Sequence, residues 1–218
     1  MSKKLTIKNA YLEITSRCNL RCIHCYNASG DIAYCDMDLA VLAMLTDFLR
    51  DKGLELLSIS GGEPLLHPQC RTILEMCKAK QFRVLLATNG LQLLQNLEAL
   101  KFVDIIQVSL DGATAAVHDS IRGKGSFERV IDQLKELKQY QLNPKVVLRV
   151  SVNKHNYDHI EDIVLLAIKL GLAGVTFSLI RPSGRGRTYY AALKLSSDEI
   201  ICTRLPVITT TTCQIFQF

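Results

Sequence analysis

The sequence lacks several features that would place it in other classes of protein. Its net charge of +5 is spread without a block of like charges, so an acidic partner is possible but nucleic acid is not expected. Met1–Lys4 contains two lysines and no apolar segment follows, so we expect no signal peptide. Lys169, Gly171 and Gly174 interrupt the apolar stretch 163–180, which predicts a helix end and a strand start rather than a membrane span.

Disulfide bonds are also not expected, although the chain has eight cysteines. Without a secretory signal, these residues indicate a reducing compartment, the cytoplasm. Cys70 and Cys77 are seven residues apart on one face of a predicted helix, where we expect small buried side chains. We expect the same of Cys35.

Short β-rich runs alternate with helical patterns along the chain, whose 218 residues and 48% hydrophobic content suit one domain with a substantial core. Ser126 is expected to cap one helix at its N-terminus, and Gly171 to end another. Strand–helix repeats imply parallel strands with right-handed crossovers, hence an α/β fold, a six-stranded parallel (β/α)6 partial barrel of TIM type. The predicted strands are Tyr11–Thr15, Leu54–Ser60, Phe82–Thr88, Ile105–Leu110, Val146–Val152 and Val175–Ile180.

The predicted strands also indicate a polar interior. Side chains alternate between the two faces of a strand. In the first strand Leu12 and Ile14 would face the helices and Glu13 and Thr15 the interior. The same alternation turns Gln107, Ser109 and Asp111 inward in the fourth strand, and Arg149, Ser151 and Asn153 in the fifth. Because parallel α/β folds bind ligands at the carboxyl ends of their strands, we expect a polar cavity there.

Three further cysteines lie close together in the string Cys-Asn-Leu-Arg-Cys-Ile-His-Cys-Tyr at 18–26. Soft thiolates at the spacing of Cys18, Cys22 and Cys25 suit zinc or an iron–sulfur cluster. A structural zinc site has four ligands, normally two separated pairs, but no second pair follows, and His24 is poorly placed to join the same tetrahedron. Three thiolates on a four-iron cluster leave one iron open to an exchangeable ligand.

The cysteine string resembles the signature of the radical S-adenosylmethionine enzymes, and two later strings support the resemblance. Gly61-Gly62-Glu63-Pro64 follows the second predicted strand and is similar to the family's methionine-binding segment. Ser-Leu-Asp-Gly at 109–112 is similar to its ribose and carboxylate contact region. The cysteine string and the Ser-Leu-Asp-Gly string most resemble those of one branch of the family. That branch includes peptide maturases, PQQ- and haem-modifying enzymes and the molybdopterin-precursor cyclase.

The resemblance implies two cofactors, a [4Fe–4S] cluster and S-adenosylmethionine. Cys18, Cys22 and Cys25 would hold the cluster, and reductive cleavage of S-adenosylmethionine would give a 5′-deoxyadenosyl radical that abstracts hydrogen. Glu63 would orient the methionyl amine or simply cap a helix, and Arg149 would bind the carboxylate. The implied contacts to S-adenosylmethionine are Tyr26, Gly61, Gly62, Glu63, Ser109, Arg149 and Asn153.

The resemblance leaves the substrate and the catalytic partners open. A ribosomally made peptide is the expected substrate, with small-molecule or nucleotide cyclisation in cofactor biosynthesis as the alternative. An electron donor such as flavodoxin or ferredoxin is implied; nucleic acid and membrane are not. Hydrogen abstraction needs no acid–base pair, so no catalytic side chain is assigned, and His118 and Asp119 are expected in a loop. The arginine-rich segment 181–187 either holds an anionic group of the substrate or forms a solvated turn.

The resemblance weakens toward the end of the chain. Relatives in this branch usually continue into an extension with auxiliary clusters, whereas Cys202 and Cys213 are too few for one. Residues 1–195 are therefore expected to form the partial-barrel domain, and residues 196–218 an atypical tail that begins with a helix at Ser196–Glu199. The threonine run at 209–212 suits neither a helix nor a metal loop, so we expect either a minimal barrel-only enzyme or a truncated, non-catalytic remnant.

Overall fold

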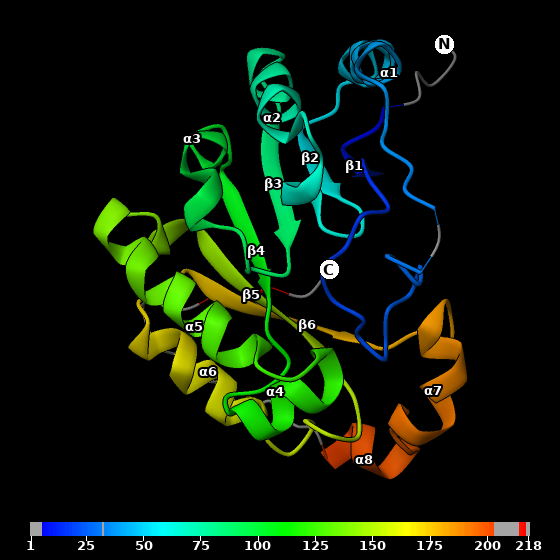
Figure 1. The fold of residues 1–218 in the computed structure, drawn as a ribbon, viewed down its shortest axis with the longest axis vertical. Helices are drawn as coiled ribbons and strands as arrows, with labels where there is room; N and C mark the ends of the chain where they lie inside the picture. Colours follow the sequence, from blue (N-terminus) through cyan, green and yellow to red (C-terminus); the bar gives the residue numbers. More distant parts are fainter. Residues whose placement is uncertain (1–5, 32, 203–213, 217–218) are drawn as a thin grey trace.

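The computed structural model describes residues 6–31, 33–202 and 214–216, and strands alternate with helices throughout (Figure 1). The strands are β1 (Asn9–Glu13), β2 (Leu56–Ser60), β3 (Arg83–Thr88), β4 (Ile105–Ser109), β5 (Val146–Val152), β6 (Gly174–Leu179) and β7 (Gln214–Phe216). The α-helices are α1 (Leu39–Asp51), α2 (Cys70–Ala79), α3 (Leu97–Leu100), α4 (Ala115–Arg122), α5 (Ser126–Leu137), α6 (Ile160–Lys169), α7 (Arg185–Leu193) and α8 (Ser197–Cys202).

The strands form one parallel sheet in the order β1-β2-β3-β4-β5-β6-β7. From β1 to β6, helical structure lies between each strand and the next along the chain. In Figure 1, α2, α3, α5 and α6 lie on one side of the sheet, whereas α7 and α8 lie apart from them at the lower right. The predicted six-stranded partial barrel is thus confirmed. The short β7 adds a seventh strand beside β6 that the sequence did not predict. The threonine run at 209–212 and Cys213 fall outside the described residues.

Apolar side chains on alternate strand positions form the core between sheet and helices. The fully buried members of this set are Leu57, Ile59, Val84, Leu86, Ile106, Val108, Val146, Leu148, Val150 and Val175. On the opposite, concave face, Gln107 donates to Thr176 at 3.4 Å and accepts from Arg149 at 3.3 Å. The predicted alternation of apolar and polar faces in β4 and β5 is therefore confirmed, and polar side chains line the concave face.

Helix ends follow the sequence signals with two differences. Gly171, with φ of +68°, follows α6 as expected of a glycine at that position. Ser126 is instead the first residue of α5, and Asp119 accepts from the Gly125 and Phe127 amides at 2.6 and 2.8 Å. The prediction of a loop at His118 and Asp119 was wrong, because Thr114 caps α4 and both residues lie within that helix. In the described part of the chain, every helix is too short or too polar to span a bilayer.

Candidate functional site

The three clustered cysteines lie on a long loop between β1 and α1, which we call the cysteine loop (residues 14–38). Cys18, Cys22 and Cys25 are free thiols, partly buried at the carboxyl ends of the strands. Cys70 and Cys77 are buried within α2, as predicted. Cys35 is exposed, so the prediction that it is buried was wrong: it lies on the returning half of the loop, outside the core.

The Gly-Gly-Glu segment after β2 holds the start of the cysteine loop by close backbone contact. The Gly62 amide donates to the Thr15 carbonyl at 2.7 Å, and the Glu63 amide donates to the Arg17 carbonyl at 2.6 Å. A Cβ atom at Gly61 would lie 2.3 Å from the Thr15 oxygen, and one at Gly62 would lie 2.2 Å from the Arg17 oxygen. Both glycines are therefore required sterically, because any side chain would push the two segments apart.

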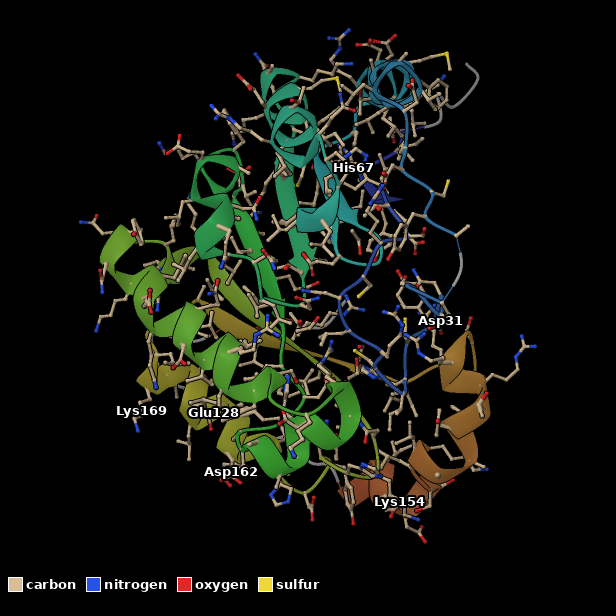
Figure 2. All side chains as sticks on the ribbon, viewed as in Figure 1. Asp31, His67, Glu128, Lys154, Asp162 and Lys169 are labelled. Atoms are coloured by element: carbon tan, nitrogen blue, oxygen red, sulfur yellow. The ribbon has the colours of Figure 1, made fainter. Side chains whose placement is uncertain are left out.

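The segment after β6 contacts the other end of the cysteine loop, where the blue chain descends to the first turn of α7 (Figure 1). Arg185 donates to the carbonyls of Cys22 and Ser29 at 3.0 and 3.2 Å and pairs with Asp31, which lies beside the start of α7 in Figure 2. The Gly186 amide donates to the Cys25 carbonyl at 3.2 Å. Arg185 therefore holds the loop, and the expectation of a solvated turn or a substrate-binding arginine was wrong for this residue.

Asp111 joins the loop to the centre of the fold. This fully buried carboxylate accepts from Arg122 Nε at 2.6 Å, and His24 Nε2 lies 3.2 Å from the same oxygen. Its other oxygen accepts from the Ser151 amide at 2.7 Å. His24 therefore uses its Nε2 atom to contact Asp111.

The charges in this network set its protonation states. Burial opposes ionisation of Asp111, but the charges of Arg122 and His24 and the hydrogen bonds to the carboxylate outweigh burial and hold its pKa well below the ordinary value. Burial raises the pKa of the Cys22 thiol to about 11, although the neighbouring Arg122 charge opposes the rise. Arg122 Nη1 lies 4.0 Å from the Cys22 sulfur.

Glu63 is fully buried and has three hydrogen bonds. Its carboxylate accepts from the Thr88 hydroxyl at 2.7 Å, the Asn89 amide at 2.6 Å and the Leu65 amide at 3.2 Å. The last of these caps the short 3-10 helix Pro64–Leu66, which is the simpler of the two roles expected for Glu63. Glu63 thus ties the end of β2 to the end of β3 beside the cysteine loop.

The remaining sequence-predicted contacts occupy different surroundings. Tyr26 donates to Glu13 and lies 2.9 Å from the Tyr11 hydroxyl, on the concave face beside β1. Burial, followed by these hydrogen bonds, raises the Tyr26 pKa far above its usual range. Ser109 and Arg149 are register partners across β4 and β5, and Arg149 is exposed.

Asn153 lies apart from this group, in the turn after β5. Its side chain donates to the Ser151 carbonyl at 2.8 Å and accepts from the His155 amide at 2.9 Å. The structure therefore brings Tyr26 toward β1 and places Ser109 with Arg149, whereas the Asn153 amide is used within its own turn.

Sequence reasoning missed Arg122 and Arg185 as residues that contact the cysteine loop. Arg122 belongs to the string His-Asp-Ser-Ile-Arg, which was expected to form a loop, and its contact with Cys22 joins residues one hundred positions apart. Arg185 was noticed only for its charge. The partners of both residues depend on how α4 and α7 approach the loop, which local sequence patterns do not specify.

The donor set fits a multi-iron cluster better than a single ion. Within the described ranges, no three His, Cys, Asp or Glu side chains are close enough to share one metal ion. Each thiolate of an iron–sulfur cluster binds its own iron, so its ligands can be further apart. The three cysteines are free and partly accessible, and they are held on one loop, as such a cluster requires.

The sequence is similar to those of several known proteins. The chain is 32% identical over 191 residues to mycofactocin maturase MftC of Mycobacterium tuberculosis, covering 86% of this chain and 48% of that protein. It is 34% identical over 184 residues to the subtilosin biosynthesis protein AlbA of Bacillus subtilis, covering 82% and 41%. The chain thus spans about half the length of these relatives or less.

The fold is similar to that of SuiB of Streptococcus suis, solved with bound S-adenosylmethionine. The TM-score is 0.75 at 15% identity, over 98% of this chain and 51% of SuiB. The model of the Radical SAM superfamily matches residues 12–167, from β1 into α6. Because this match covers more than half of the sequence, the chain belongs to the Radical SAM superfamily.

Proposed function

We propose that this chain is a radical enzyme that binds a [4Fe–4S] cluster through Cys18, Cys22 and Cys25 and modifies a ribosomally made peptide. When bound, the cluster supplies the electron that cleaves S-adenosylmethionine to a 5′-deoxyadenosyl radical, which abstracts hydrogen from the substrate. The protein positions the reactants and limits the access of water. Gly61, Gly62 and Glu63 support the cysteine loop, and Arg149 offers a charged group to the cofactor's carboxylate.

One observation carries this proposal: three free thiols lie on a single loop that three other parts of the fold hold in place. The Gly-Gly-Glu segment contacts its start, Asp111 and Arg122 contact its centre, and α7 contacts Cys22 and Cys25. A loop without regular secondary structure would otherwise not keep three ligands in a fixed arrangement. The relatives named as maturases favour a peptide among the possible substrates.

Iron binding tests the cluster. Anaerobically reconstituted protein should bind about four irons per chain and show visible absorption that dithionite bleaches. Changing Cys18, Cys22 or Cys25 to Ala should abolish this absorption. Cys70→Ala is the matched control, because Cys70 is a buried thiol in α2 and lies outside the cysteine loop. Tightly bound zinc without iron after reconstitution would overturn the assignment.

Substrate class is tested separately with the same reduced protein. We expect that S-adenosylmethionine and a short precursor peptide encoded beside the gene give a change in peptide mass together with 5′-deoxyadenosine, measured by mass spectrometry. GTP, incubated in parallel, should remain unchanged. Conversion of GTP without any modification of the peptide would replace the peptide proposal with nucleotide cyclisation.

A further inference from the structure

Arg122 is the last residue of α4, and its side chain is only 9% exposed. A buried guanidinium is unfavourable unless charged or polar partners compensate for lost hydration. Among the described residues its partners are the Asp111 carboxylate, 2.6 Å from Nε, and the Cys22 sulfur, 4.0 Å from Nη1. The Nε atom of Arg122 therefore faces the Asp111 carboxylate, and its Nη1 atom faces the Cys22 sulfur, which is predicted to bind iron.

The other arginines at the cysteine loop contact backbone carbonyls or carboxylates rather than sulfur, and Arg17 pairs with Asp36 at 2.9 Å. Arg185 donates to the Cys22 carbonyl, and Arg21 donates to the carbonyls of Cys18 and Leu20. Both of these arginines also pair with Asp31. Within the part of the chain that the structure describes, Arg122 is thus the arginine placed against a cysteine sulfur.

The Asp111 carboxylate cancels only part of the positive charge of Arg122 at the position of the Cys22 sulfur. It faces Nε, whereas Nη1 faces the sulfur. The carboxylate is also shared with His24 and the Ser151 amide. A net positive field and an N–H donor therefore remain on the side of Cys22. Asp111 in turn fixes the position of the guanidinium, because it joins α4 to the centre of the sheet.

We propose that Arg122 is a positioning residue for the cluster, donating to the Cys22 sulfur and making the cluster easier to reduce. The inference rests on the proposed function, since it needs the cluster to bind. Reduction transfers one electron from an external donor, dithionite in the test, to a cluster whose three thiolates already make it anionic. Hydrogen bonds to the sulfurs and nearby positive charge favour the reduced state and raise the potential.

The test compares redox titrations of anaerobically reconstituted variants, followed by electron paramagnetic resonance and iron analysis. Arg122→Met should keep its iron, but its midpoint potential should fall. At the potential at which half of the wild-type cluster is reduced, the ratio of reduced to oxidised cluster in Arg122→Met should be about tenfold lower than in the wild type. This is the change expected for one lost charge-assisted hydrogen bond. Arg129→Met is the control: it removes the same charge from an exposed position on α5 and should titrate like the wild type.

A double variant separates this role from simple neutralisation of Asp111. Asp111→Asn combined with Arg122→Met removes both charges and the sulfur donor, so its potential should stay below that of the wild type. This variant also decides the question if Arg122→Met alone does not fold. A wild-type potential in the double variant, or in iron-loaded Arg122→Met, would overturn the inference. Failure of the wild type to bind four irons would instead overturn the proposed function, and this inference with it.

Discussion

At the scale of single residues, Glu63 has an unusual acid–base environment. Burial raises the Glu63 pKa from 4.5 to about 7, although the hydrogen bonds from Asn89, Thr88 and Leu65 oppose the rise. A carboxyl group with a raised pKa binds its proton more tightly in the folded than in the unfolded state. Its contribution to stability is therefore full below pH 4.5 and is lost as the pH rises to 7.

Glu63→Gln should remove this pH dependence. Between pH 4.5 and 7 the free energy of unfolding of the wild-type apoprotein should fall by about 3 kcal/mol more than that of the variant. Urea unfolding at several pH values measures the difference, and the histidines common to both proteins cancel in the comparison. Parallel stability curves would mean that Glu63 is ionised throughout this range.

Arg149 offers a test of the concave face. Arg149→Ala should leave iron content unchanged but weaken binding of S-adenosylmethionine by roughly 1.5–3 kcal/mol, because a charge-assisted hydrogen bond is lost. Isothermal titration measures the affinity, with Arg129→Ala as a control for loss of an exposed arginine. An affinity equal to that of the wild type would refute a carboxylate role for Arg149.

At the scale of elements, the cysteine loop depends on its neighbours. Gly62→Ala would place a Cβ 2.2 Å from the Arg17 carbonyl oxygen, and backbone cannot move away as a flexible side chain can. We expect a loss of about 1–3 kcal/mol in unfolding free energy and weaker retention of iron. Gly53→Ala is the comparison: its φ of +81° is strained for alanine, but no atom lies within 4 Å. It should lose stability without losing iron.

At the scale of the whole molecule, the concave face is open. Tyr11 on β1 and Tyr26 are 49% and 42% exposed, and Arg149 on β5 is also exposed. Water therefore reaches groups that an enclosed radical site would shield. We expect the reduced protein to cleave S-adenosylmethionine slowly to 5′-deoxyadenosine without substrate, measured by chromatography. Cleavage that occurs only after peptide is added would contradict this expectation. It would show that the site does not turn over in the absence of substrate.

Much of the architecture could be predicted because its signals are local. Alternation of apolar residues in Ile105–Leu110 and Val146–Val152 identified two strands and their inner faces, since side chains on a pleated strand must alternate. The spacing of the three cysteines indicated the loop that we propose binds the cluster, because thiolate chemistry is a property of residue type. The family followed from these strings and two others along the same chain.

Only the tertiary structure decided what surrounds those cysteines. Arg122 reaches Cys22 from α4, and Arg185 reaches it from α7, across separations of one hundred residues or more. Gly62 is essential because another backbone segment passes 2.2 Å from its missing Cβ, which no property of glycine in the sequence reveals. Residue type and spacing thus determined which groups are candidate cluster ligands. The packing of distant helices determined which charges lie against those groups, because electrostatic and steric effects depend on distance in space.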